Sequence, residues 1–123
     1  MIGYTTLGSN DIPRATAFYD ALFAEMGGQR FMDFGANFIC WASRPGQAAF
    51  CICKPFNGAP ASTGNGAMIA LLARDKAQVD ALHARAIELG ATDDGAPGPR
   101  GDNFYAGYFR DPDGNKLNVF VMG

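Results

Sequence analysis

The side chains with the clearest capacity for chemistry are three thiols and one imidazole. Cys40, Cys51, Cys53 and His83 are the cysteines and the histidine of this chain. The thiols lie in apolar, strand-like segments, and they lack the CxxC pairing and the histidines that structural zinc sites use. No imidazole is near Cys40 or Cys51 in the sequence to lower a thiol pKa. We therefore expect buried free thiols in a reducing compartment, not a disulfide framework, a zinc site or a nucleophile.

The closing segment places one polar side chain in an otherwise apolar strand. Its turn, Asp111-Pro112-Asp113-Gly114, combines a proline that presets φ, a glycine that tolerates positive φ and an aspartate that can bind the following peptide. Along the strand that follows, Leu117, Val119 and Val121 alternate with Asn118, Phe120 and Met122. Asn118 is the exception, because a buried amide needs hydrogen-bond partners that a ligand can supply.

The first half of the chain has the pattern of a strand, a helix and three further strands. Residues 2–7 alternate, Asp11 suits a helix N-cap, and Pro13 suits the first helical turn. Apolar residues then recur at helical spacing to about Met26, where two glycines end the pattern. Short strands are predicted near 29–33, 36–42 and 48–54.

The same order of elements starts again after a loop rich in Pro, Gly, Ser and Asn. Residues 67–73 are strand-like, Asp75 suits an N-cap, and a helix is predicted up to Gly90. Strands near 92–95 and 103–110, the turn and the last strand complete the half. Asp11 and Asp75 lie 64 positions apart, as do Tyr4 and Met68. The sequence therefore predicts an α+β domain of two βαβββ modules, residues 1–56 and 67–123, joined by a linker at 57–66.

Composition excludes several classes of partner. The chain of 123 residues carries a formal net charge of −2, and its basic residues are scattered, which argues against binding to nucleic acid. No apolar run approaches the ~20 residues that span a bilayer, and no signal-peptide pattern opens the chain, so we expect a cytoplasmic protein that does not bind membranes. Its small size for a protein that encloses a ligand favours a homodimer.

With this repeat and these motifs, the chain resembles the glyoxalase / bleomycin-resistance / extradiol-dioxygenase superfamily, also called vicinal oxygen chelate proteins. The resemblance covers the whole chain, and it is carried by residues 4–15 with Ala17-Phe18-Tyr19, by residues 64–68 and by residues 109–120. It implies two modules whose sheets form a cupped, partly closed mixed β-barrel, with helices outside and a ligand pocket inside. It also implies a small-molecule ligand and, as in many members, a dimer.

The resemblance assigns metal-ligand positions, and the residues at those positions are unsuitable. The positions fall on Tyr4, Met68, Asn118 and either Phe50 or Cys51. A neutral phenol, a thioether and an amide carbonyl are poor ligands for the divalent metals of this superfamily. His83 lies on a predicted helix, where we expect a surface or half-buried residue. We therefore expect no metal cofactor; a divalent metal would require atypical ligands.

The face of the predicted cup still offers a pocket for a small molecule. Its candidate lining residues combine aromatic rings with a few polar groups, as is typical of ligand sites: Tyr4, Thr6, Phe38, Cys40, Phe50, Met68, Arg100, Asn103, Tyr105, Tyr108 and Asn118. For Phe38, Phe50 and Met68, simple packing of a barrel interior is an equally good interpretation. Tyr4 and Asn118 are the weak candidates for a catalytic role. For Arg100, a solvated surface position competes with anion binding.

Three hypotheses for the function remain open at this stage. The first is a metal-free, bleomycin-resistance-like protein that binds an aromatic or amphipathic compound. The second is a lyase or dioxygenase-like enzyme, related to lactoylglutathione lyase, that uses atypical metal ligands or Tyr-based proton transfer. The third is a scaffold without a ligand. Fold resemblance does not choose among them, because function depends on the site.

Overall fold

The computed structural model describes residues 1–123, with the exception of the side chain of Asp33. Two compact units divide the chain, Met1–Ser62 and Thr63–Gly123, and the division falls inside the expected linker at 57–66. Each unit has the order βαβββ, so the predicted α+β class and the repeat of elements are confirmed. The elements are β1 (Tyr4–Gly8), α1 (Ile12–Ala24), β2 (Gln29–Asp33), β3 (Phe38–Ala42), β4 (Ala49–Cys53), β5 (Ile69–Leu72), α2 (Lys76–Glu88), β6 (Thr92–Pro99), β7 (Phe104–Arg110) and β8 (Lys116–Met122).

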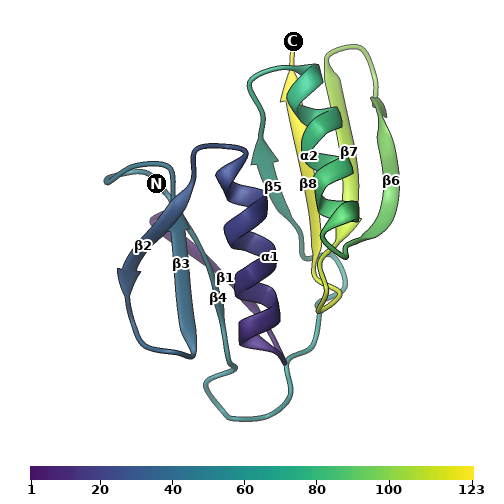
Figure 1. Ribbon diagram of the computed structural model, residues 1–123. Coiled ribbons are helices and arrows are strands. Elements are labelled where there is room, and N and C mark those ends of the chain that lie inside the picture. The colour runs from purple at the N-terminus through teal and green to yellow at the C-terminus, as the bar shows by residue number, and fades with distance from the viewer. The chain divides into compact units, whose positions relative to one another are not determined.

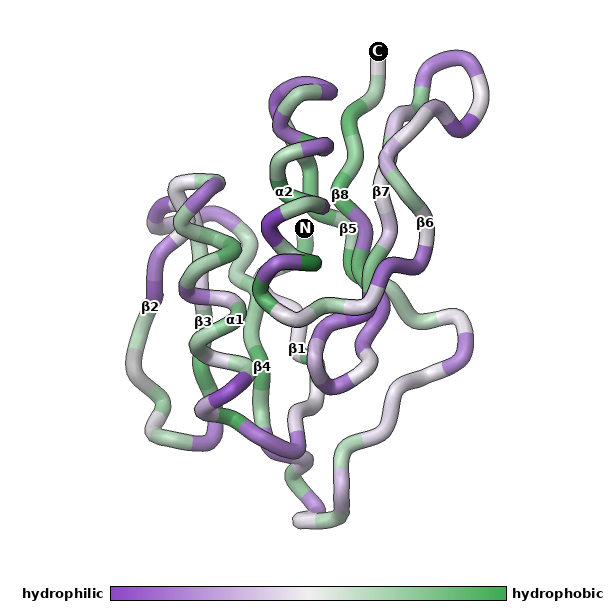
Figure 2. Tube along the Cα trace, turned by 45° about the vertical axis from the view of Figure 1, so that its right-hand side comes forward, coloured by the Kyte–Doolittle hydropathy of each residue, from purple (hydrophilic) through white to green (hydrophobic). Residues whose placement is uncertain are grey.

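Both units contain a four-stranded mixed sheet with the same topology. The strand orders are β1-β4-β3-β2 and β5-β8-β7-β6, with the first strand of each unit parallel to the last. Figure 1 shows α2 lying across β7 and β8 in the second unit. In Figure 2, β4 is green along much of its length, because its residues are all hydrophobic. Among the described residues, neither helix is long and apolar enough to cross a membrane.

The two helices begin where aspartates satisfy free backbone amides. The carboxylate of Asp11 accepts from the Arg14 amide at 3.1 Å, and that of Asp75 accepts from the Gln78 amide at 2.8 Å. These contacts confirm both predicted N-caps. Helix α1 starts with a proline in its first turn, as expected from Pro13.

An aromatic cluster fixes α1 to the first sheet. Tyr19 of α1 is fully buried, and its ring lies 4.7 Å from Phe50 of β4 and 5.7 Å from Trp41 of β3, measured between ring centroids. At the edge, Asp20 of α1 accepts from the Trp41 indole at 2.8 Å and binds the Arg30 guanidinium at 2.8 Å. The bond from Arg30 and the bond from Trp41 hold the pKa of the Asp20 carboxyl below its ordinary value, against the opposing effect of burial. Helix α1 therefore covers one face of this sheet, and the opposite face carries no helix of this unit, so we call it the helix-free face.

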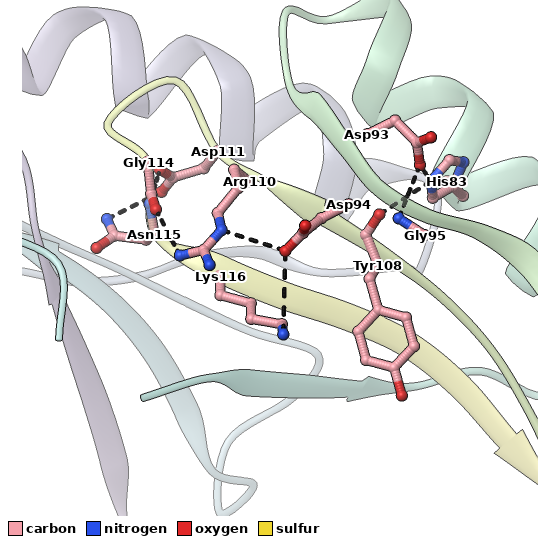
Figure 3. A network of polar contacts seen from close by, with 10 residues as sticks. All are labelled: His83, Asp93, Asp94, Gly95, Tyr108, Arg110, Asp111, Gly114, Asn115 and Lys116. Atoms are coloured by element: carbon pink, nitrogen blue, oxygen red, sulfur yellow. Dashed lines mark hydrogen bonds and ion pairs between the residues drawn. The ribbon is translucent and has the colours of Figure 1, made fainter. Parts of the chain in front are cut away.

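In the second unit, α2 packs on the corresponding face. Val79, Leu82 and Ala86 of α2 are buried, as are Leu117 and Val119 of β8. The His83 ring inserts between α2 and β7, where Gly107 leaves room for it: a Cβ there would lie 3.0 Å from the imidazole. Its Nε2 lies 3.0 Å from Asp93 Oδ1 and 3.1 Å from the Tyr108 carbonyl oxygen, as Figure 3 shows. His83 thus joins a helix to two strands. It lies on α2 as expected, but it is buried, with 7% exposure, and not at the surface or half-buried.

Several strand boundaries differ from the expected ones, and the largest difference is in β6. Strand β5 is shorter than the predicted 67–73, and β6 extends to Pro99, well beyond the predicted end at 95. The sequence of β6 is rich in Gly, Pro and Asp, which are depleted from strands. It is held as an edge strand by pairing with β7, with register shifts on both sides of Gly95, where φ is +149°. Edge strands tolerate such residues because one side of the backbone needs no partner.

The closing turn has the bonding that its sequence predicts. The Asp111 carboxylate is buried and accepts from the amides of Asp113 (3.0 Å) and Asn115 (2.9 Å) and from the Asn115 side chain (3.1 Å). The Gly114 amide donates to the Asp111 carbonyl at 2.8 Å, and Gly114 has a φ of +88°. One carboxylate thereby organises the whole connection from β7 to β8.

Replacing that carboxylate should destabilise the protein strongly. Asp111→Ala removes a buried acceptor of several hydrogen bonds, so we expect the free energy of unfolding to fall by about 3 kcal/mol. Urea denaturation followed by circular dichroism measures this change. Asp102→Ala, in an exposed loop, serves as the control and should change stability by less than about 0.5 kcal/mol. Equal stabilities of the two variants would contradict the structural role of Asp111.

Candidate functional site

The face of the first sheet that α1 leaves uncovered carries both aromatic rings and thiols. Strand pairing aligns Tyr4 with Ala49 and Cys40 with Cys51, and these residues alternate with the helix-facing ones. Because neighbouring residues of a strand point to opposite faces, the thiols and Tyr4 share the helix-free face. The Tyr4 ring packs edge-on against Phe38, with centroids 6.4 Å apart, and Phe34 packs edge-on against the same Phe38 at 5.5 Å.

A cavity of about 480 Å³ opens on this face. Its walls are almost entirely apolar: Gly3, Tyr4, Phe31, Met32, Phe34, Phe38, Cys40, Ala49 and Cys51. Cavities of this size and composition are typical of small-molecule sites. The structure thus brings together three of the predicted pocket residues, Tyr4, Phe38 and Cys40, along with Cys51.

Burial in this cavity keeps the Cys51 thiol in its protonated form. Burial, a hydrogen bond with Cys40 and the charges that Cys40 and Cys53 would carry when ionised raise the pKa of Cys51 to about 12. Burial, and then the neighbouring Cys40, also raise the pKa of Cys53, while a hydrogen bond with Thr6 opposes the shift. All three cysteines are free, as expected. A thiol with a raised pKa is a poor nucleophile near neutral pH, so the cavity offers soft, polarisable contact surface.

A second helix-free face, on the sheet of the other unit, carries the polar candidates. Asn118 pairs with Tyr108 across β7 and β8, and its side chain is only 1% exposed. Among the described residues, its Oδ1 atom is buried and has no hydrogen-bond partner. The Tyr108 ring lies 5.5 Å from both the Lys116 ammonium and the Arg100 guanidinium. As the sequence analysis expected, the buried amide of Asn118 has an oxygen atom that could accept a hydrogen bond from a ligand.

Two predicted pocket residues lie on the wrong face. Phe50 contacts Tyr19 and Phe23 under α1, and it is buried in the core of its unit. Tyr105 faces α2, where its hydroxyl donates to Asp80 at 2.7 Å and the Lys76 ammonium lies over its ring. Their assignment to the cup face was wrong, because a register error of one residue reverses every side chain of a strand. With Phe50 turned inward, the alternative Cys51 occupies the helix-free face.

The other predicted pocket residues lie outside the walls of this cavity. Thr6 is on the helix-free face beside Cys53, outside the cavity walls. Met68 precedes β5 and is partly exposed, and Asn103 is in the exposed turn before β7. Arg100 donates to the carbonyls of Ala96 and Pro99 while lying over Tyr108.

Sequence reasoning missed Phe31, Met32, Phe34 and Ala49 as cavity residues. Strand β2 has a register shift between Arg30 and Asp33, and Met32 has a φ of +60°. This irregularity breaks the alternation that the sequence analysis relied on, so the faces of β2 could not be assigned from it. For Ala49 the signal was available, because it lies two residues before Cys51 on the same strand.

Comparison with known proteins agrees with the geometry. The family model for the Glyoxalase/Bleomycin resistance protein/Dioxygenase superfamily matches residues 1–119. The chain belongs to this superfamily. The glyoxalase-like α+β fold predicted from the resemblance is thereby confirmed. A comparison with curated proteins finds no significant match.

Solved structures of this superfamily share the fold along the entire chain. A glyoxalase/bleomycin resistance protein from Albidiferax ferrireducens T118 is 34% identical, with 100% of this chain and 99% of that chain covered and a TM-score of 0.89. A lactoylglutathione lyase from Agrobacterium tumefaciens is 24% identical, with 98% and 92% covered and a TM-score of 0.72. A glyoxalase/bleomycin resistance protein/dioxygenase family enzyme from Burkholderia phytofirmans PsJN is 21% identical, with 98% of each chain covered and a TM-score of 0.78. The latter two likenesses concern the fold alone.

The residues at the superfamily's metal positions do not fit a divalent metal. Tyr4 offers a neutral phenol and is 64% exposed, Met68 offers a thioether, Asn118 offers a neutral carbonyl, and Cys51 is the single thiol at these positions. Within the part of the chain that the structure describes, no group of three His, Cys, Asp or Glu side chains is arranged to hold a metal ion. His83 is bound to Asp93 on the helix side of its sheet. Hard or borderline metals need nitrogen or charged oxygen donors, which these positions lack.

The raised thiol pKa can be tested by chemical labelling. The pKa of Cys51 is raised in the native state, so the protonated form favours folding below the ordinary thiol pKa of 9.0, and this contribution is lost as the pH rises toward about 12. At pH 8.5 we expect iodoacetamide to modify Cys51 at least about a hundredfold more slowly in native protein than in urea. Mass spectrometry of tryptic peptides measures both rates. Half-buried Cys53 should react before Cys51, and equal native rates for all three thiols would contradict this assignment.

Proposed function

We propose that this protein binds a small, largely apolar, aromatic-type molecule on the helix-free face of its first sheet, without a divalent metal. The observation that carries the proposal is the cavity of about 480 Å³, whose described lining residues include no imidazole and no carboxylate. Three aromatic rings that meet edge-on, Tyr4, Phe34 and Phe38, offer a geometry that an aromatic ligand can extend. Apolar burial supplies the affinity, and the Tyr4 hydroxyl is available to orient a polar substituent.

The donor chemistry supports binding over metal-dependent catalysis. The metal positions carry neutral side chains, and burial keeps the Cys51 thiol of the cavity protonated. The alternative is a lyase or dioxygenase-like enzyme of this superfamily. It predicts turnover that depends on a metal and is lost in Tyr4→Phe or Asn118→Ala. Binding alone requires neither a metal nor turnover.

A neutral fluorescent probe, N-phenyl-1-naphthylamine, tests the cavity directly. Phe38→Ala removes a ring contacted by Tyr4 and Phe34, and we expect it to weaken probe binding about tenfold. Phe56→Ala is the matched control, because Phe56 is fully exposed in the segment that follows β4, and it should leave the affinity unchanged. Fluorescence titration gives both values, and equal affinities would contradict the proposed cavity.

Metal removal forms the second arm of this test. Dialysis against EDTA should leave the probe affinity unchanged, and elemental analysis of purified protein should find no stoichiometric transition metal. A tightly held metal, together with turnover that EDTA abolishes, would overturn the metal-free proposal and favour the enzyme.

We further propose a homodimer. Ile2, Tyr4, Met32 and Phe34 are large apolar side chains of the first unit that are more than half exposed, and three of them line the cavity. Such clustered apolar exposure is typical of an interface. Sedimentation equilibrium should give twice the chain mass of 13.1 kDa, and Met32→Lys, which places a charge in the patch, should shift the protein toward the monomer. A monomeric wild type would contradict this proposal.

A further inference from the structure

Positive charge gathers on the helix-free face of the second sheet. Arg110 pairs with Lys116 across β7 and β8, and Tyr108 lies two residues before Arg110, so the three side chains share a face. Arg100 reaches the same Tyr108 ring from the end of β6. We call these residues, Arg100, Tyr108, Arg110 and Lys116, the cationic face. Figure 3 shows Tyr108, Arg110 and Lys116 with the acidic residue between them, Asp94.

The charges of this face are not balanced. Asp94 Oδ2 accepts from Arg110 Nε at 3.2 Å and lies 3.9 Å from Lys116 Nζ. Arg100 donates to backbone carbonyls of Ala96 and Pro99 and has no carboxylate partner among the described residues. The neighbouring Asp93 is engaged by His83 and the Gly95 amide. Asp94 therefore contacts two cations, Arg110 and Lys116, and an anion bound here would meet a surplus of positive charge.

A cavity of about 320 Å³ adjoins the cationic face within the same unit. Its walls are the glycine-rich segment 64–68, Arg110 and Lys116. The backbone amides of Gly64, Asn65 and Gly66 donate to no acceptor within the described residues. Gly66 has a φ of +98°, the left-handed conformation that occurs in anion-binding loops. Two cations and free amides thus face one space, which is the donor set that binds carboxylate and phosphate groups.

Tyr108 and Asp94 orient the side chains of Arg110 and Lys116 but do not neutralise both positive charges. The Lys116 ammonium lies 5.5 Å from the Tyr108 ring centroid, which restricts a flexible side chain before a ligand arrives. The Arg110 guanidinium is braced by Asp94 on one side and by the Gly114 carbonyl at 3.2 Å on the other. An incoming oxyanion would compete with the carboxylate of Asp94 for the same two cations.

We propose that this cavity binds an oxyanion group, the carboxylate or phosphate of a small molecule, through Arg110, Lys116 and the amides of residues 64–66. The site goes beyond the apolar cavity of the first unit and does not depend on it. It is recognised by charge, whereas the first cavity is recognised by apolar contact.

The competition with Asp94 permits a test in both directions. Titration calorimetry at low ionic strength, where screening is weak, would use inorganic phosphate and benzoate as separate probes, to distinguish a phosphate from a carboxylate ligand. Lys116→Gln should weaken binding of the preferred probe about tenfold through loss of a charge-assisted contact. Asp94→Asn should strengthen it several-fold, about threefold to tenfold, by removing the competing carboxylate.

Matched variants control for net charge. Lys76→Gln at the start of α2 and Glu88→Gln at its end make the same charge changes on the helix side of the same sheet, and both should leave the affinity within about twofold of wild type. Thermal melts establish that each variant is folded. The proposal is overturned if neither probe binds saturably to wild type, if the controls match the site variants, or if Asp94→Asn weakens binding. Loss of probe binding to the apolar cavity would leave this result unaffected, so the two proposals fail separately.

Discussion

One helix covers one face of each four-stranded sheet, and every candidate site depends on this constraint. The side chains of a strand alternate between the two faces of the sheet. Those on the helix side are buried in the core, and those on the opposite side are available for contact with ligands. In the first unit, Phe50 and Trp41 pack against Tyr19 on the helix side. The complementary residues, Tyr4, Cys40 and Cys51, are thereby committed to the opposite face.

The same architecture has produced chemically different faces in the two units. In the first, the helix-free face carries aromatic rings and thiols, and burial keeps the Cys51 thiol protonated. In the second, it carries Lys116, Arg110 and the buried amide of Asn118. Among the described residues, neither face arranges three His, Cys, Asp or Glu side chains to hold a metal ion, although the fold is retained along the whole chain. The scaffold therefore tolerates exchange of its functional residues, because its stability rests on the helix-facing side chains.

Much of the fold was predictable because its signals are local. The N-caps Asp11 and Asp75 and the closing turn around Asp111 depend on residues within four positions of one another, and each has the predicted bonds. The candidate site was only partly predictable. Tyr4, Phe38 and Cys40 line one cavity of the structure. Phe50 and Tyr105 lie on the helix side instead of the predicted face, because an error of one residue in strand register reverses a side chain. Phe31 and Phe34 were missed because β2 departs from regular alternation.

The sequence by itself determined the order of the elements, their repetition and the absence of good metal ligands at Tyr4, Met68 and Asn118, since these follow from residue types and local spacing. Only the tertiary structure decided which residues share a cavity, that Cys51 stays a thiol, and that one carboxylate, Asp94, stands between Arg110 and Lys116. Those facts depend on pairing between strands and on burial. Both bring together residues that are distant in the sequence, and no local pattern records the distances between them.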